Sequence, residues 1–365
     1  MDVHVNPFCG REFPPAAELA HGLVRSDPSN VQALLERCPA AAPTPLLTLP
    51  SLAEQFEVER LDLKDERSRM GLGSFKALGA GHVIARMAAD RLDGAGREVD
   101  AEAAATALTG TVFACASAGN HGMSVAATAA VFGAEARIYL SETVPEAFVA
   151  RLRGRGATVT RAGVDYESSM VAAAAGADQH GWVLLSDSSW PGYVDVPLGV
   201  MEGYLAMAAE IVATLEAPAT HVLVQAGVGG LAAAVSSLIR AAWGGAPRIV
   251  VVEPTAAPAL QASIRAGRPV TASGPASSMG RLDCKEPSHL ALGELARTAD
   301  CFVTVNDHEV EATGALLEEH GIATTPSGAA GVSALHHAGV DRDVLGIGRG
   351  SRVLAIITER PEHAA

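Results

Sequence analysis

Short runs of apolar residues recur along the chain and alternate with alanine-rich stretches whose apolar positions repeat with a helical period. In the run RIVVVE at residues 248–253 the four central residues are all β-branched and apolar, which is typical of a strand buried on both faces. The predicted strands are residues 58–63, 111–116, 136–140, 158–162, 182–186, 221–224, 248–253, 301–305 and 353–358. Helical patterns include residues 122–132, 146–153, 201–215 and 230–242. The alternation predicts an α/β fold with mainly parallel sheets.

These strands are too many for one ordinary sheet, so we expect two three-layer α/β domains. The larger domain is predicted to comprise residues 1–76 and 195–365, and the smaller one residues 77–194. No long glycine, serine or proline linker separates them, so the chain is expected to cross between domains more than once. The first ~45 residues show no regular pattern, and we assign them no chemistry.

Composition narrows the class of protein. The chain has 365 residues, 48% of them hydrophobic, and a net charge of −14, which argues against nucleic acid and anionic membranes as partners. Its cysteines are scattered without a CxxC pair, so we expect neither a disulfide framework nor a metal site, and a cytoplasmic protein. The cysteines are Cys9, Cys38, Cys115, Cys284 and Cys301. No signal peptide is expected from the first ten residues, MDVHVNPFCG.

Residues 222–239 contain no charged side chain, so a membrane span is one alternative for them. Gln225 and a cluster of glycines divide this stretch into a short β-branched run and a small-residue helix. A buried strand, a turn and a helix are therefore the better interpretation.

The glycine cluster itself predicts an anion site, because glycines let backbone N–H groups approach an oxyanion at a helix N-terminus. One alternative is a dinucleotide site, with Gly227-x-Gly229-x-x-Ala232 as the fingerprint and Glu253 as the ribose-binding acid. A second is a simple phosphate-ester site, and a third is a tight turn without a ligand. The loop alone does not choose among them.

Lys76 is one of three lysines in the chain and lies in the stretch GLGSFKALGA. Its neighbours are small or apolar, which indicates close packing, so a packed amine able to form a Schiff base stands here beside a solvated surface charge as an equal alternative. About forty residues later, ACASAGNHGMSVAATAA places a polar glycine loop between a strand and a helix. Ser117, Asn120, His121 and the loop N–H groups are candidates for binding a carboxylate, and an ordinary capped turn is the alternative.

Three motifs, SFKALGA with Lys76, SAGNHG with Asn120 and GVGG at residues 227–230, occur in the order and spacing found in a known family. The chain thereby resembles pyridoxal-phosphate enzymes of fold type II, whose fold is that of the tryptophan synthase β-subunit. The family includes serine and threonine dehydratases, serine racemase, cysteine synthase and diaminopropionate ammonia-lyases. The resemblance implies pyridoxal 5′-phosphate as cofactor and a homodimer, and it assigns the glycine loop to the cofactor phosphate.

Further stretches are similar to diaminopropionate ammonia-lyases in particular: LKDERSRMGLGSFKALGA, SDSSWPGYVDVPLGVMEGY, SSMGRLDC and VLAIITE. The likeness extends over residues 44–359. It implies a carbon–nitrogen lyase that performs α,β-elimination on a small L-amino acid, converting 2,3-diaminopropionate to pyruvate and ammonia. A serine/threonine-type dehydratase or a β-replacement enzyme of the same fold is the alternative within the family, and an NAD-dependent dehydrogenase the alternative outside it.

The resemblance also implies roles for individual residues. Lys76 would hold the cofactor in a Schiff base and act on the substrate α-proton, and Asp187 would bind a β-ammonium group; capping of a turn is the alternative for Asp187. The cofactor-binding residues would be Lys76, Phe75, Asn120, Gly227, Val228, Gly229, Gly230, Leu231 and Thr358. The substrate-binding residues would be Ser117, Ala118, Gly119, His121, Asp187 and Ser327.

Two departures from the family pattern bear on substrate choice. Ala118 stands where diaminopropionate ammonia-lyases have aspartate and serine racemase has serine, so the chain lacks an acid/base opposite the lysine. This predicts turnover of L-substrates only and no racemase activity. Pro326 stands where many relatives have glutamate, which removes one carboxylate beside Ser327.

Overall fold

The computed structural model describes residues 1–11, 13, 23–96 and 100–361. They divide into two compact units. The first comprises Met1–Ser29, Ala40–Phe75 and Ser188–Ala365, and the second comprises Asn30–Pro39 and Lys76–Asp187. The expected division placed residues 30–39 and Lys76 in the larger domain, whereas the structure groups them with the second unit. Residues 188–194, expected in the smaller domain, belong to the first unit, in which Ser189 is hydrogen-bonded to Ser288.

The first unit is built on a seven-stranded sheet with the order β1-β10-β9-β8-β11-β3-β2. The five inner strands are parallel, and an antiparallel strand closes each edge. In that order the strands are β1 (Asp2–Val5), β10 (Cys301–Val305), β9 (Arg248–Pro254), β8 (His221–Gln225), β11 (Arg352–Ile357), β3 (Arg60–Asp65) and β2 (Leu46–Thr48). Strands β8, β9, β10 and β11 are buried along almost their whole length, as their largely apolar sequences require.

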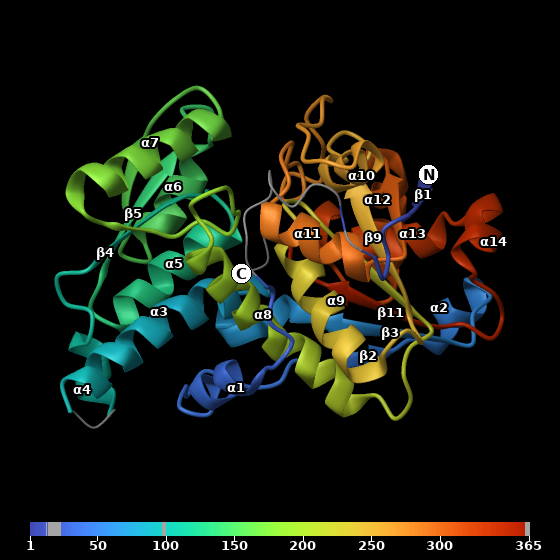
Figure 1. The fold of residues 1–365 in the computed structure, drawn as a ribbon, viewed down its shortest axis with the longest axis horizontal. Helices are drawn as coiled ribbons and strands as arrows, with labels where there is room; N and C mark the ends of the chain where they lie inside the picture. Colours follow the sequence, from blue (N-terminus) through green and yellow to red (C-terminus); the bar gives the residue numbers. More distant parts are fainter. Residues whose placement is uncertain (12, 14–22, 97–99, 362–365) are drawn as a thin grey trace. The chain divides into compact units, whose positions relative to one another are not determined.

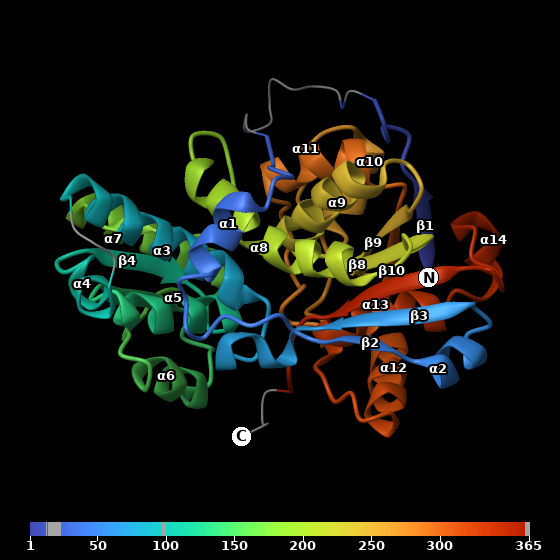
Figure 2. The same cartoon turned by 90° about the horizontal axis from the view of Figure 1, so that it is seen from below.

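Helices cover both faces of this sheet (Figures 1 and 2). Helices α8 and α9 lie on one face in Figure 2, and α12 and α13 lie on the other, where α13 contacts β8 through β11. The helices of this unit are α2 (Pro50–Gln55), α8 (Asp195–Thr214), α9 (Gly230–Trp243), α10 (Ala259–Ala266), α11 (His289–Thr298), α12 (Asp307–Glu319), α13 (Pro326–His336) and α14 (Arg342–Leu345), with 3-10 turns at Glu66–Gly71 and Gly339–Asp341.

The second unit contains a four-stranded parallel sheet with the order β6-β5-β4-β7. Its strands are β4 (Val112–Ala116), β5 (Glu135–Leu140), β6 (Thr158–Arg161) and β7 (Val183–Leu184). Helices α5 and α7 pack against β4 and β5, as Figure 1 shows. The helices are α3 (Lys76–Gly94), α4 (Ala101–Thr106), α5 (Asn120–Val131), α6 (Glu146–Arg153), α7 (Tyr166–His180) and most of α1 (Ser29–Leu35).

The predicted α/β class with mainly parallel sheets is confirmed, and each strand expected from the sequence is present with small shifts at its ends. Strands β1 and β2 were not predicted, because they are short antiparallel edges in the segment that shows no hydrophobic period. Residues 12 and 14–22 of that segment lie outside the described residues.

Residues 222–239 form parts of β8 and α9 with the expected turn between them. Within the described part of the chain, one helix is long and apolar enough to cross a membrane, α8. The structure buries 67% of its apolar window, and a core helix of this kind passes the same test.

Candidate active site

The candidate residues follow the carboxyl ends of parallel strands, where open α/β sheets place their ligands. In the second unit, the loop containing Ser117 follows β4, and Asp187 comes shortly after β7. In the first unit, the glycine loop follows β8, and Thr358 directly follows β11. Each unit thus carries its own set of candidate groups.

Lys76 begins α3, and its amine forms an ion pair with the carboxylate of Asp187. The donor is Nζ of Lys76 and the acceptor is Oδ2 of Asp187. Both side chains are largely withdrawn from solvent, with 22% and 16% of their surfaces exposed. The lysine singled out by its small and apolar neighbours is therefore a packed amine beside a carboxylate, not a solvated surface charge.

The environment of Asp187 keeps its carboxyl ionised. Burial alone would raise the pKa of Asp187, but the charge of Lys76 and its hydrogen bond to the carboxylate outweigh burial and hold that pKa well below the usual range. A carboxylate in this state can bind a cation at any pH near neutrality.

His121 is the second residue of α5 and is buried. Its Nε2 atom is 2.9 Å from the carbonyl oxygen of Leu185, the residue two before Asp187. Burial lowers the pKa of His121, with Asp187 opposing the shift, so Nε2–H is the donor of a neutral ring. The imidazole expected to bind substrate is thus directed at the backbone that leads to Asp187.

The loop before α5 has the geometry of an anion site. Gly119 occupies the N-cap position and no side chain caps the helix, so the first backbone N–H groups lack intrahelical partners. Ser117 Oγ accepts a hydrogen bond from the N–H of Gly119 at 3.3 Å. A Cβ atom at Gly122 would lie 2.1 Å from the carbonyl oxygen of Ser117, so the tight approach of loop and helix requires glycine there. Ala118 and Asn120 lie in the same loop–helix junction.

The glycine loop of the first unit leads from β8 into the N-terminus of α9. Gly229 has φ +103° and no side chain caps the helix, which leaves the first N–H groups for an anion. A Cβ atom at Gly227 would approach Cys284 Sγ to 3.0 Å, and one at Gly229 would approach Cβ of Ala291 to 3.0 Å. A side chain at either glycine would therefore displace its neighbours, and Val228, Gly230 and Leu231 continue the same turn.

Three further candidates lie in the first unit and are buried. Phe75 packs against the ring of Tyr204 with centroids 4.9 Å apart. Thr358 is 3% exposed, and its carbonyl oxygen accepts a hydrogen bond from the N–H of Phe75 at 3.1 Å. Ser327 Oγ accepts from the N–H of Arg281 at 3.2 Å, so this hydroxyl is engaged inside the protein.

Glu253 has a structural role that the sequence did not reveal. It is fully buried at the end of β9, and its two oxygens accept the N–H groups of Leu260 at 2.7 Å and Gln261 at 2.8 Å. These are the second and third residues of α10, whose N-terminus Glu253 therefore caps. Burial raises the pKa of Glu253 to about 8, against the effect of the two hydrogen bonds.

Sequence reasoning also missed a buried ion pair beside Thr358. Glu359 is 2% exposed and pairs with Arg281 and with the hydroxyl of Thr325. Thr325 caps α13 through the N–H of Gly328. A carboxylate therefore lies next to the turn in which Pro326 stands, supplied by the segment that follows β11 rather than by the turn itself. In the sequence, the position of Glu359 directly after Thr358 was the feature that pointed to this carboxylate.

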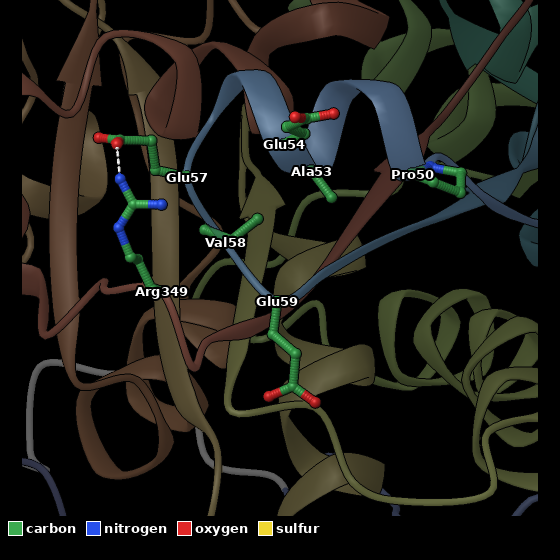
Figure 3. A pocket seen from close by; sticks show the side chains of 7 residues that line it. All are labelled: Pro50, Ala53, Glu54, Glu57, Val58, Glu59 and Arg349. Carbon is green, nitrogen blue, oxygen red and sulfur yellow. Dashed lines mark hydrogen bonds and ion pairs between the residues drawn. The ribbon is translucent and has the colours of Figure 1, made fainter.

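A separate cavity of about 310 Å³ lies at α2 and the segment before β3 (Figure 3). Glu54, Glu57 and Glu59 line it, and Arg349 pairs with Glu57. The cavity lies where β3 and β11 begin, which is the end of these strands opposite their carboxyl ends. We therefore assign it no part in the candidate active site.

Comparison with known proteins identifies the family of this chain. The family described as "Pyridoxal-phosphate dependent enzyme" matches residues 38–359. The chain belongs to this family. Diaminopropionate ammonia-lyase of Salmonella typhimurium is 31% identical over 296 residues, which cover 76% of this chain and 72% of the relative. A serine dehydratase-like protein of Mus musculus is 31% identical over 227 residues, covering 61% and 66%.

The fold of this pyridoxal-phosphate dependent enzyme matches solved structures of fold type II. A crystal structure of diaminopropionate ammonia-lyase from Escherichia coli in complex with D-serine has a TM-score of 0.87 and 27% identity. The match covers 98% of this chain and 93% of that chain.

The described residues fit the cofactor. Lys76 supplies an amine for covalent attachment, and the uncapped glycine turn before α9 supplies backbone N–H donors for a phosphate. The alternative of an NAD-dependent dehydrogenase is wrong, because the family is that of pyridoxal phosphate. Glu253, the acid that alternative needed, is buried and caps α10.

Proposed function

We propose that this enzyme is an ammonia-lyase that eliminates ammonia from L-2,3-diaminopropionate. With one water consumed, the products are pyruvate and two molecules of ammonia. The observation that carries the proposal is the ion pair between Lys76 and Asp187. An ionised carboxylate beside the reactive amine suits a substrate whose β-substituent is an ammonium group. Relatives that carry the name diaminopropionate ammonia-lyase support it.

Bound pyridoxal phosphate supplies the electron-withdrawing group that makes the Cα proton of an amino acid acidic. Residues 227–231 would hold its phosphate through backbone N–H groups, and Lys76 would attach it through Nζ. Asn120 and Phe75 would contact its ring, and Thr358 would offer a neutral hydroxyl to the ring nitrogen.

Substrate binding and proton transfer belong to residues of the second unit. Ser117, Gly119 and the first N–H groups of α5 bind the substrate carboxylate. Asp187 binds the β-ammonium group, and Lys76 Nζ takes the proton from Cα as the general base. Ala118 offers no titratable group, so Lys76 is the base for the L-isomer and the D-isomer is not turned over.

A dehydratase acting on L-serine or L-threonine is the second candidate function, and the serine dehydratase-like relative supports it. The two differ in the leaving group, which is a cation in one case and a neutral hydroxyl in the other. Asp187 favours the cation, because an ionised carboxylate without a cationic partner is costly in a largely buried site.

A substrate panel tests the proposal. Purified holoenzyme is incubated with L-diaminopropionate, L-serine, L-threonine and O-acetyl-L-serine, and keto acid and ammonia are measured, with Lys76→Ala as the inactive control. We expect L-diaminopropionate to give the highest kcat/KM and two ammonia per pyruvate. Keto acid from L-serine or L-threonine but not from L-diaminopropionate would refute the ammonia-lyase assignment in favour of the dehydratase.

We also propose that the protein is cytoplasmic and forms a homodimer. Its five cysteines are all free, as is usual in a reducing compartment, and the resemblance to fold type II enzymes supports the dimer. Light scattering of the purified holoenzyme tests the mass, and a monomer of 37.3 kDa would contradict the dimer.

A further inference from the structure

The Ser-Trp-Pro-Gly-Tyr segment, residues 189–193, forms a rigid turn. Trp190 and Tyr193 exchange backbone hydrogen bonds of 3.3 and 2.9 Å, and their rings stack with centroids 4.4 Å apart and an interplanar angle of 18°. Gly192 allows the turn because its φ is +87°. The segment is specific in sequence, yet its aromatic residues have no part in the proposed chemistry.

The turn is attached to the N-terminus of α11 by two buried serines. Ser189 and Ser288 are 2% and 0% exposed. Their hydroxyl oxygens lie 2.7 Å apart, and Ser288 Oγ also accepts the N–H of Ser189 at 3.1 Å. Ser288 occupies the N-cap position of α11 without capping the helix itself. The cap comes from Ser189, whose Oγ accepts the N–H of Leu290 at 2.9 Å.

The same N-terminus supports the glycine loop. The N–H of Ser288 donates to the carbonyl oxygen of Val228 at 2.9 Å, and Ala291 is the side chain that a Cβ at Gly229 would meet at 3.0 Å. The loop therefore has one polar and one apolar support, and both come from the first turn of α11.

The hydrogen bond to Val228 fixes the direction of a donor. In a planar trans peptide the carbonyl oxygen and the following N–H point in opposite directions. With the Val228 carbonyl held toward Ser288, the N–H of Gly229 is directed away from α11. It is one of the N–H groups that residues 227–231 would offer to a phosphate.

We propose that Ser189 and Ser288 are positioning residues for the phosphate-binding loop. Their paired hydroxyls fix the first turn of α11, and that turn fixes the peptide between Val228 and Gly229. The inference rests on pyridoxal phosphate as the cofactor and is independent of which amino acid is the substrate.

The test compares Ser189→Ala, Ser288→Ala and the double variant with the wild type. The dissociation constant of pyridoxal phosphate is measured by titrating the apoenzyme, and the bound phosphate is observed by 31P NMR. Each single variant is expected to weaken cofactor binding about 5-fold, since a lost buried hydrogen bond costs roughly 1 kcal/mol. The 31P resonance should shift, and kcat at saturating cofactor should change less than about 3-fold. The double variant should be little worse than either single variant, because the two hydroxyls act as one unit.

Thr298→Val is the matched control, because Thr298 is buried at the other end of α11 and its hydroxyl donates to the carbonyl oxygen of Glu294 in the same helix. It should leave the dissociation constant unchanged. If Ser288→Ala does not fold, Ser288→Cys replaces it, since it keeps the side-chain shape with a weaker acceptor. Folded serine variants that bind the cofactor like the wild type, or a control equally impaired, would overturn the inference. A wild type that binds the cofactor but makes no pyruvate from diaminopropionate would refute the proposed function alone.

Discussion

Nζ of Lys76 donates a hydrogen bond to Oδ2 of Asp187, and the resulting ion pair joins the first residue of α3 to the residue that ends the second unit. The pair gives the candidate site two opposite charges within direct contact. It also separates two roles, since the amine is the group that reacts with a carbonyl and the carboxylate is the group that attracts a cation.

Asp187→Asn removes the negative charge with little change in shape. We expect kcat/KM for L-diaminopropionate to fall about 100-fold, and the value for L-serine to fall much less, because only the first substrate has a cationic β-group. Steady-state kinetics with both substrates measure the difference. Asp178→Asn, an exposed aspartate on α7, is the control and should leave both values unchanged. Equal losses for both substrates would mean that Asp187 does not recognise the β-ammonium group.

The difference in stability between the wild type and Asp187→Asn should depend on pH. The pKa of Asp187 in the folded protein lies below its ordinary value of 3.8. The stabilisation from its ionised form is therefore present above about pH 4 and is lost as the pH falls through the folded pKa. The difference in free energy of unfolding between wild type and Asp187→Asn should shrink on acidification, as urea unfolding at several pH values would show.

Gly229→Ala should weaken cofactor binding by more than about 10-fold and lower stability by about 1–3 kcal/mol. The added Cβ would meet Ala291 and Leu260 at 3.0 and 3.1 Å, and the backbone has φ +103°. Titration of the apoenzyme with pyridoxal phosphate and urea unfolding measure the two effects. Gly350→Ala is the control, since its Cβ would meet no atom within 4 Å. A Gly229→Ala variant with normal cofactor affinity would show that the loop tolerates displacement and does not bind the phosphate closely.

Glu253→Gln should change how stability depends on pH. The pKa of Glu253 is raised from 4.5 to about 8 by burial, so between these values the folded protein holds a proton that the unfolded chain releases. The free energy of unfolding of the wild type should fall as the pH rises through this window, by roughly 1 kcal/mol per pH unit from this group. The variant should lose that slope, as would be seen by urea unfolding at pH 5, 6.5 and 8. Glu311→Gln, exposed on α12, should keep it, and an unchanged slope in Glu253→Gln would contradict the buried neutral carboxyl.

Ala118→Asp should permit slow turnover of D-diaminopropionate, while the wild type consumes the L-isomer alone. An aspartate there would provide the second acid/base that Ala118 cannot provide. Chiral chromatography of the residual substrate measures both isomers. Measurable turnover of the D-isomer by the wild type would refute the role given to position 118.

The sequence predicted the central parallel strands of the large sheet because they are apolar runs that need burial on both faces, as RIVVVE in β9 illustrates. It predicted Lys76 because small and apolar neighbours are unusual around a solvated lysine. Strands β1 and β2 were not predicted, since edge strands of three or four residues are too short to show a hydrophobic period.

Roles that depend on contacts between residues far apart in the sequence were not predicted either. His121 and Leu185 are 64 residues apart, and Ser189 and Ser288 are 99 residues apart. Nothing local to either serine indicates which partner it meets. The sequence likewise left Glu253 without a role, which its two hydrogen bonds from the N–H groups of α10 supply. Composition and periodicity report burial and element type, whereas hydrogen-bond partners depend on the tertiary fold.

The short antiparallel strands at the edges of the large sheet bear on self-association. A sheet edge offers unpaired N–H and C=O groups to which a strand from another molecule can add, and long apolar edges promote aggregation. Here the outer strands β1 and β2 have four and three residues, while the apolar strands β8, β9, β10 and β11 are paired on both sides. The apolar strands of this chain that are best suited to form fibrils are thus accessible only after the sheet has opened. Resistance to aggregation should therefore increase with the stability of the first unit against unfolding.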